Sequence, residues 1–162
     1  MATEGRNLSY YDESSLPDVS DFRIGIVVSE WNPDITENLL KGARETLLRL
    51  GVKEENILVW HVPGSFELIY GARRMQENKF IDGIIAIGSI IRGETPHFEY
   101  VSQATALGLA QLNTFGTIPV VFCVLTDDNK QQAIDRSGGK HGNKGVDSAV
   151  AVLKMAWLKK NS

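Results

Sequence analysis

Residues 22–28 have the sequence FRIGIVV, a short apolar run rich in β-branched side chains. Such a run is typical of a strand that is buried on both faces. A helix is predicted directly after it, because Asn32 can cap with its side-chain oxygen, Pro33 suits the first turn and Gly51 can end the helix. Apolar side chains recur between these residues at helical spacing: Ile35, Leu39, Ala43, Leu47 and Leu50.

The same alternation continues along the chain. Further strands are predicted at residues 56–62, 83–91 and 118–125, and further helices at 65–77, 96–115, 129–137 and 143–160. In the helix at 65–77, apolar side chains recur at helical spacing: Phe66, Ile69, Tyr70 and Met75. The side chains expected to face inward from the helix at 96–115 are Val101, Ala104, Leu107 and Leu112. Apolar strands that alternate with helices form a parallel sheet covered on both sides, with right-handed crossovers. We therefore expect an α/β fold, a three-layer flavodoxin-like sandwich with a four-stranded parallel sheet.

Composition and length restrict the class of protein. The 162 residues fit one domain, predicted at 22–162, and residues 1–21 contain too few apolar groups to fold alone, so an extended N-terminal arm is expected there. The net charge of −3 argues against nucleic-acid and membrane partners. No long apolar run or targeting pattern occurs, which favours a cytoplasmic protein. One cysteine, Cys123, and no cluster at metal-ligand spacing predict neither a disulfide nor a metal site.

Ligands of such sheets gather at the carboxyl ends of the strands, which selects the loops at 29–33, 63–67, 89–97 and after Leu125. The segment 92–97, RGETPH, leads directly into a predicted helix. Free backbone amides at a helix start favour a phosphate, so an anion site is expected at residues 93–95. His97 then suits proton transfer beside that anion, although a histidine that only caps or packs is the alternative.

Basic residues return in the glycine-rich segment 136–145, RSGGKHGNKG, which includes Arg136 and Lys144. It is either a second phosphate-contacting element or a solvated connection between two helices. A Walker A motif is excluded because Lys144 precedes Gly145 rather than Ser or Thr. No GxGxxG motif follows the first strand, so a dinucleotide site has no support.

Two aromatic residues occur in neighbouring loops at the expected ligand edge. Trp31 and Phe66 could stack on a planar heterocycle, and core packing is the alternative for both, especially for Phe66. Glu67 could accept hydrogen bonds from sugar hydroxyls or ring N–H groups, or could simply favour a helix start. His61 and Cys123 are interpreted as packing residues.

Three segments taken together, VPGSFE at 62–67, GSIIRGETPHFEY at 88–100 and RSGGKHGNKG at 136–145, resemble the lumazine synthase family. The resemblance covers about residues 22–158 and omits the arm. It implies a transferase-class, cofactor-free condensation at the penultimate step of riboflavin biosynthesis. The substrates would be 5-amino-6-(D-ribitylamino)uracil and 3,4-dihydroxy-2-butanone 4-phosphate, and the products 6,7-dimethyl-8-ribityllumazine, phosphate and water.

The resemblance also assigns roles to residues. Trp31, where the family commonly has Phe, would stack on the pyrimidine, and His97 would move protons. The ribityl chain and ring edge would be held by Ser65, Phe66 and Glu67, with backbone groups of Ser89, Ile90 and Ile91. Glu94 and Thr95 would offer amides to the phosphate, which requires the carboxylate of Glu94 to point away from it. Phe122, Arg136 and Lys144 are similar to residues that the family supplies from a neighbouring subunit, with Arg136 pairing with phosphate.

The family forms homopentamers, and some members assemble twelve of these into icosahedral capsids. Residues 137–144 carry no insertion of the kind found in pentamer-only members, so a capsid-competent pentamer is expected. The arm, with Tyr10, Tyr11 and Leu16, would lie along a neighbouring subunit, and riboflavin synthase is a further partner that the family suggests. Two rival functions remain: a binding or shell protein that holds lumazines or flavins without catalysis, and another phosphosugar-binding α/β enzyme.

Overall fold

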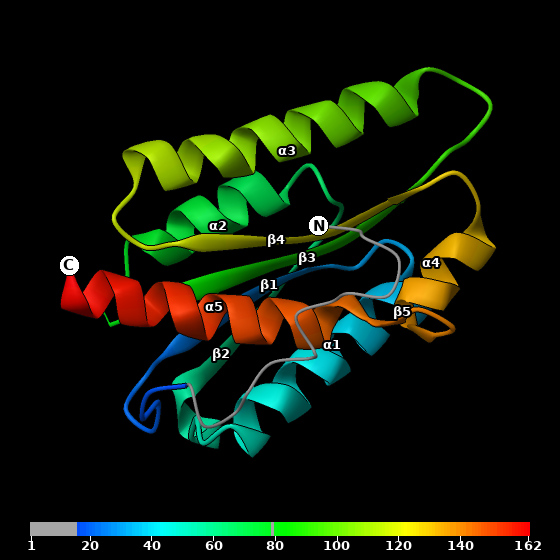
Figure 1. Ribbon diagram of the computed structural model, residues 1–162. Helices are drawn as coiled ribbons and strands as arrows, with labels where there is room; N and C mark the ends of the chain where they lie inside the picture. The colour runs from blue at the N-terminus through cyan, green and yellow to red at the C-terminus, as the bar shows by residue number, and fades with distance from the viewer. Residues whose placement is uncertain (1–15, 79) are drawn as a thin grey trace.

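The computed structural model describes residues 16–78 and 80–162 of the chain (Figure 1). Its four main strands are β1 (Ile24–Ser29), β2 (Ile57–Val62), β3 (Gly83–Ile91) and β4 (Val120–Asp127). Its α-helices are α1 (Pro33–Arg49), α2 (Leu68–Gln76), α3 (His97–Phe115), α4 (Lys130–Arg136) and α5 (Lys144–Asn161). A short 3₁₀ turn, η2 (Glu54–Asn56), precedes β2, and two short strands, β5 (Ser137–Gly139) and β6 (Gly142–Asn143), join α4 to α5.

The four main strands form one parallel sheet in the order β2-β1-β3-β4. Ile24 of β1 pairs with Ile57 on one side and with Gly83 on the other, and Ile84 pairs with Val120. Because every strand runs the same way, all four carboxyl ends lie at one edge of the sheet, which we name the carboxyl edge. The predicted α/β flavodoxin-like fold with a four-stranded parallel sheet is confirmed.

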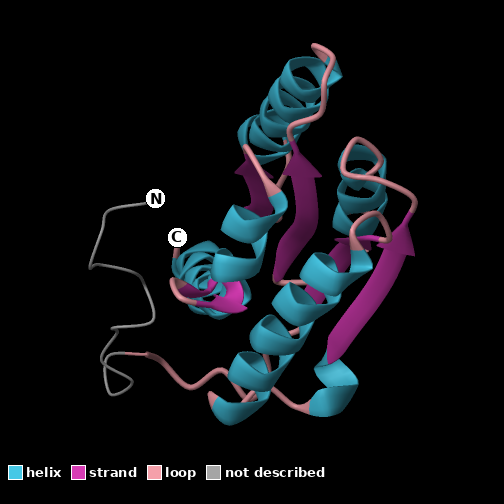
Figure 2. Cartoon of the chain, turned by 90° about the vertical axis from the view of Figure 1, so that its right-hand side faces the viewer, coloured by secondary structure: helices cyan, strands magenta, loops and turns pink. Residues whose placement is uncertain are grey.

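Two apolar layers cover the sheet. Figures 1 and 2 show α2 and α3 on one side of the sheet and α1 and α5 on the other. Alternation along β3 divides its side chains between them, so that Ile85 and Ile87 pack with α1 and α5 while Ile84 and Ala86 pack with α2 and α3. Residues 83–90 are all buried, which explains the unbroken apolar run that predicted this strand.

Two predictions about side-chain packing, for Leu107 and for His61, are wrong. Leu107 is 63% exposed on α3 rather than inward, and Phe66 and Tyr70 are also exposed. The second helix begins at Leu68, not at residue 65, so the buried face is instead formed by Leu68, Gly71, Ala72 and Met75. His61 is not a packing residue, because β2 is an edge strand and its Nε2 lies 3.1 Å from Glu37 Oε1 at the surface.

The sequence predicted that the side chain of Asn32 caps α1, but it makes no such hydrogen bond. Asn32 adopts the left-handed conformation with φ 58°, and its Nδ2 donates to the carbonyl of Ser89 at 3.1 Å. Asparagine tolerates this conformation better than most residues, so the side chain is free to reach across to β3. Pro33 does start the helix and Gly51, with φ 107°, follows its end, as expected.

The hairpin of β5 and β6 was predicted only as a glycine-rich connection. Gly138 and Gly142 take positive φ values of 122° and 77°, which explains the need for glycine there. Asn143 then caps α5, since its Oδ1 accepts from Gly145 N at 2.8 Å and its Nδ2 donates to Asn38 O of α1 at 2.8 Å. The start of α5 is thereby joined to α1.

Only the last residues of the predicted arm belong to the described part of the chain. Val19 is 2% exposed and packs in the core, and its carbonyl accepts from Phe22 N at 3.0 Å. Tyr10 and Tyr11 lie outside the described residues. Within residues 16–78 and 80–162, no helix combines the length and apolar character that crossing a bilayer requires.

Candidate active site at the carboxyl edge

Backbone and side-chain hydrogen bonds tie the loops of the carboxyl edge to one another. Glu30 N donates to Val62 O at 2.8 Å, which joins the loops after β1 and β2. Asn32 Nδ2 donates to Ser89 O, which joins the loop after β1 to β3, and Arg92 N donates to Asp127 O at 2.9 Å, which joins β3 to β4. The four loops selected from the sequence therefore form one continuous edge.

Residues 93–95 present backbone amides without partners. Within residues 16–78 and 80–162, the amides of Gly93, Glu94 and Thr95 donate to no backbone carbonyl or side chain. All three residues are exposed, and a Cβ added to Gly93 would meet nothing within 4 Å. The loop before α3 thus leaves free N–H groups and open space, which together suit an anion.

His97 is the first residue of α3 and follows these amides after Pro96. Its side chain is exposed and makes no hydrogen bond or ion pair with the described residues, and Pro96 occupies the N-cap position. Packing or capping therefore does not account for the histidine in this chain. An exposed imidazole beside free amides can exchange protons with a bound anionic substrate.

Two serine hydroxyls near the edge are buried without a partner among the described residues. Ser65 is 6% exposed and Ser89 is 1% exposed, and neither Oγ has a hydrogen bond. Ser65 lies against Gly88, where an added Cβ would come 2.7 Å from its Oγ. Ile90 and Ile91 point into the two core layers, so only their backbone groups can reach a ligand.

Trp31 and Phe66 are both exposed, at 69% and 54%, so neither is a core residue. Trp31 is held through its backbone, whose N–H donates to Ser29 Oγ at 3.2 Å. Glu67 is exposed beside Phe66, with Oε2 close to Gly64. The loops after β1 and β2 therefore offer two aromatic surfaces and a carboxylate to solvent.

Of the remaining candidate residues, Arg136 and Lys144 have other partners within the chain, and Phe122 is exposed. Arg136 Nη1 lies 3.5 Å from Asp127 Oδ1 and donates to Gln132 O at 3.4 Å. Lys144 Nζ lies 2.8 Å from Asp147 Oδ2. Phe122 is 44% exposed on the edge strand β4. No described contact joins these three residues to Trp31, Phe66 or His97 of the same chain.

Asp127 is a residue of this edge that the sequence reasoning did not single out. Its side chain is buried at the end of β4, and its Oδ2 has no partner among the described residues. Burial raises the pKa of this carboxyl, while Arg136 acts in the opposite direction. The signal available in the sequence was a charged residue at the end of an apolar strand.

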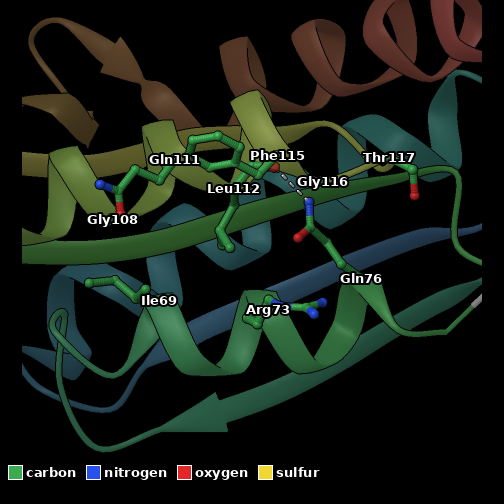
Figure 3. Close-up of a pocket in the computed structure, with 9 residues that line it drawn as sticks. All are labelled: Ile69, Arg73, Gln76, Gly108, Gln111, Leu112, Phe115, Gly116 and Thr117. Carbon is green, nitrogen blue, oxygen red and sulfur yellow. Dashed lines mark hydrogen bonds between the residues drawn. The ribbon is translucent and has the colours of Figure 1, made fainter.

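One hollow lies away from this edge. A cavity of about 460 Å³ is formed between α2 and the C-terminal half of α3, with Gln76 and Phe115 among its lining residues (Figure 3). The Gln76 amide donates to the carbonyls of Leu112 at 3.2 Å and Ile118 at 2.6 Å, which fixes the end of α3 to α2. Arg73 is the one cationic residue among those that line the cavity, and its Nη1 lies 3.7 Å from Glu77 Oε1. None of the residues that line this hollow belongs to the loops of the carboxyl edge.

Known proteins resemble the chain over its whole length. A family model described as 6,7-dimethyl-8-ribityllumazine synthase matches residues 21–160. The 6,7-dimethyl-8-ribityllumazine synthase of Christiangramia forsetii is 54% identical, covering 100% of this chain and 97% of the relative. The enzyme of the same name from Flavobacterium johnsoniae is 53% identical, covering 100% and 85%, and that from Porphyromonas gingivalis is 53% identical, covering 99% of each chain. The chain belongs to the 6,7-dimethyl-8-ribityllumazine synthase family.

Proposed function

We propose that the chain condenses 5-amino-6-(D-ribitylamino)uracil with 3,4-dihydroxy-2-butanone 4-phosphate to give 6,7-dimethyl-8-ribityllumazine, phosphate and water in riboflavin biosynthesis. Membership of the family supports the product. The observation that carries the choice of a phosphate substrate is the row of free amides at residues 93–95 beside the exposed His97.

The pyrimidine substrate would bind at the loops after β1 and β2. Trp31 presents a large exposed ring for stacking, and Phe66 and Glu67 present a second aromatic surface and an acceptor. The unpaired hydroxyl of Ser65 is buried, so it would bond a ribityl hydroxyl only after a local shift that exposes it, and the backbone of residues 89–91 borders the same edge. These groups hold the nucleophilic amine in place.

The phosphate substrate would bind at the start of α3. The amides of Glu94 and Thr95 donate to the phosphate, and the exposed carboxylate of Glu94 is free to turn to solvent. Arg136 of a neighbouring subunit would add a planar guanidinium that can donate two hydrogen bonds to the phosphate. Phe122 and Lys144 of that subunit would border the phosphate site. Within the described residues Arg136 pairs with Asp127 and Lys144 with Asp147, and the assignment of Phe122, Arg136 and Lys144 to a neighbouring subunit rests on the family resemblance.

The reaction then proceeds by proton transfers. The amine attacks the ketone, the adduct loses water to form a Schiff base, phosphate is eliminated, and the second amine closes the ring with loss of water. His97 takes and returns the protons. The sequence of steps involves no net oxidation or reduction, so it calls for no redox cofactor, and a transferase-class, cofactor-independent enzyme is proposed.

The test is lumazine formation by absorbance when purified protein meets the two substrates without cofactor. We expect product with an equal amount of phosphate. The variant His97→Ala should keep the fold and lose roughly 10²-fold to 10⁴-fold in kcat, which is the usual share of one acid–base group. Unchanged activity in that variant would remove His97 from the mechanism.

The rival functions predict different outcomes of the same assay. A binding or shell protein would bind a ribityl ligand tightly without turnover. Another phosphosugar enzyme would release no lumazine, and the exposed pair of Trp31 and Phe66 would have no role in it. The exposed and unpaired His97 favours the enzyme over the binding protein.

We further propose a cytoplasmic homopentamer that can assemble into a 60-subunit capsid, with riboflavin synthase as a candidate partner. The short hairpin of β5 and β6, without an insertion, supports this assembly. The mass of the native particle decides between the two sizes, and a protein that forms pentamers alone would count against the capsid.

A further inference from the structure

Arg92 lies at the base of the loop that carries the free amides and His97. Its backbone N–H donates to Asp127 O at 2.9 Å, and its Nε donates to Asp128 Oδ1 at 2.8 Å. Its Nη1 donates to Glu99 Oε1 in the first turn of α3. The guanidinium also lies over the ring of Phe98, 4.2 Å from the centroid. One side chain therefore joins the end of β4 to the start of α3.

The charge of Arg92 is already engaged by these partners. The hydrogen bonds that Arg92 donates to Asp128 and then to Glu99 raise the pKa of Arg92, and the same contact with Arg92 lowers the pKa of Glu99. A planar guanidinium can satisfy two carboxylates with different edges and stack with its face, whereas a lysine offers one point charge. Arg92 is thus oriented by two carboxylates and a ring, not left free for a substrate phosphate.

The loop between Arg92 and α3 has few other attachments. The amides of residues 93–95 have no partner among the described residues, and no described atom would contact a Cβ at Gly93. The position of this loop accordingly depends on its two ends. Arg92 holds the first end through Asp127 and Asp128, and the second end through Glu99 and Phe98.

We propose that Arg92 is a positioning residue that sets the path of residues 93–96 and the direction of His97. The role of these groups toward substrate rests on the proposed function. We use the word clamp for the contacts of Arg92 with Asp128 and Glu99. The clamp contributes little to global stability, because exposed ion pairs add little to the free energy of unfolding. Its effect is on geometry, where a displacement of about 1 Å can cost up to about 10²-fold in rate.

The kinetic test compares Arg92→Met and Arg92→Lys with a matched control, Arg74→Met. Arg74 of α2 forms a similar arginine–glutamate pair with Glu77, the residue after the helix, and its side chain is 55% exposed against 43% for Arg92. We expect Arg92→Met to lower kcat/KM for the butanone phosphate by about tenfold or more, with a smaller change in KM for the pyrimidine. Arg92→Lys should recover part of the loss, and Arg74→Met should stay within about twofold of the native enzyme.

Two further measurements separate positioning from a general loss of structure. The thermal midpoints of Arg92→Met and Arg74→Met should be alike. Because Asp128 and Glu99 act through Arg92, adding Asp128→Asn or Glu99→Gln to Arg92→Met should cause no further loss. Kinetics within twofold of native in Arg92→Met, or equal changes in both KM values with a lowered thermal midpoint, would overturn the proposal.

Amide hydrogen exchange tests the clamp without any reliance on activity. The hydrogen-bonded amides of Glu99 and Tyr100, which donate to Pro96 O, should exchange faster in Arg92→Met than in the native protein or in Arg74→Met. Inorganic phosphate should slow the exchange of the free amides of residues 93–95 in the native protein. If the native protein forms no lumazine, the proposed function fails, while faster exchange still upholds the clamp. Unchanged exchange in Arg92→Met would refute the clamp even in an active enzyme.

Discussion

Cys123 is a nucleophile that the fold makes inert. It is 3% exposed on β4, and burial raises the pKa of its thiol to about 12. The thiolate is the reactive form, so almost none is present at neutral pH. We expect iodoacetamide at pH 8 to leave the native protein unmodified and to alkylate Cys123 fully in guanidinium chloride, as measured by intact mass. Rapid labelling of the native protein would show that β4 opens at that position.

The buried carboxyl group of Asp127 makes the free energy of unfolding depend on pH. Burial raises its pKa above the ordinary value of 3.8, so the folded state binds this proton more tightly than the unfolded state does. Stability from this group is therefore lost as pH rises through the interval between 3.8 and the raised pKa. Asp127→Asn removes the loss.

We expect Asp127→Asn to be more stable than the native protein at pH 7, and the gain to vanish below pH 3.8. Urea unfolding at several pH values measures it. The control is Asp21→Asn, because the carboxylate of Asp21 is exposed and lies 3.6 Å from Lys53 Nζ at the surface. A native protein that is more stable than Asp127→Asn at pH 7 would mean that the ion pair with Arg136 outweighs burial.

At the scale of elements, the approach of α5 to α1 depends on glycine. A Cβ at Gly145 would lie 2.0 Å from Leu39 O, a backbone atom that cannot turn aside. Gly145→Ala should therefore cost about 3 kcal/mol or prevent folding, because overpacking a fixed backbone forces the two helices apart. The matched control is Gly93→Ala, where a Cβ meets no described atom within 4 Å and no change in thermal midpoint is expected. Equal midpoints in both variants would contradict the close packing.

The elements show which features a sequence pattern can predict. Apolar runs and helical spacing predicted all four main strands and five helices, because burial against a sheet imposes those periods. The pattern could not predict that Asn32 turns left-handed to reach Ser89, since that choice depends on a carbonyl 57 residues away. It also placed Leu107 in the core, although α3 has apolar residues on more than one side and spacing alone does not say which side meets the sheet.

At the scale of the whole molecule, the sheet topology brings the predicted loops to one edge. This much follows from a parallel sheet, whose carboxyl ends must meet. Of the three residues assigned to a neighbouring subunit, Arg136 lies beside Asp127 at this edge, whereas Lys144 pairs with Asp147 of α5 and Phe122 is exposed on the edge strand β4. Their assignment came from a family resemblance, and no pattern within one chain predicts a contact between two chains.

A shared site predicts that two inactive variants can restore each other. If His97 comes from one subunit and Arg136 from the next, His97→Ala and Arg136→Ala each disable every site in a pure oligomer. A mixed oligomer also contains interfaces where an intact His97 meets an intact Arg136. Random association of the two variants at equal amounts in a ring would make about one quarter of the interfaces intact.

Lumazine formation after co-expression, or after joint unfolding and refolding, measures this recovery. We expect about one quarter of the native specific activity from the mixture, while each variant treated alone stays at its own low rate. Mixing the two folded proteins without exchange of subunits provides the control and should restore nothing. If His97 and Arg136 acted within one chain, no mixture could place both intact residues in the same site, so activity after exchange at the level of the separate variants would assign the site to a single subunit.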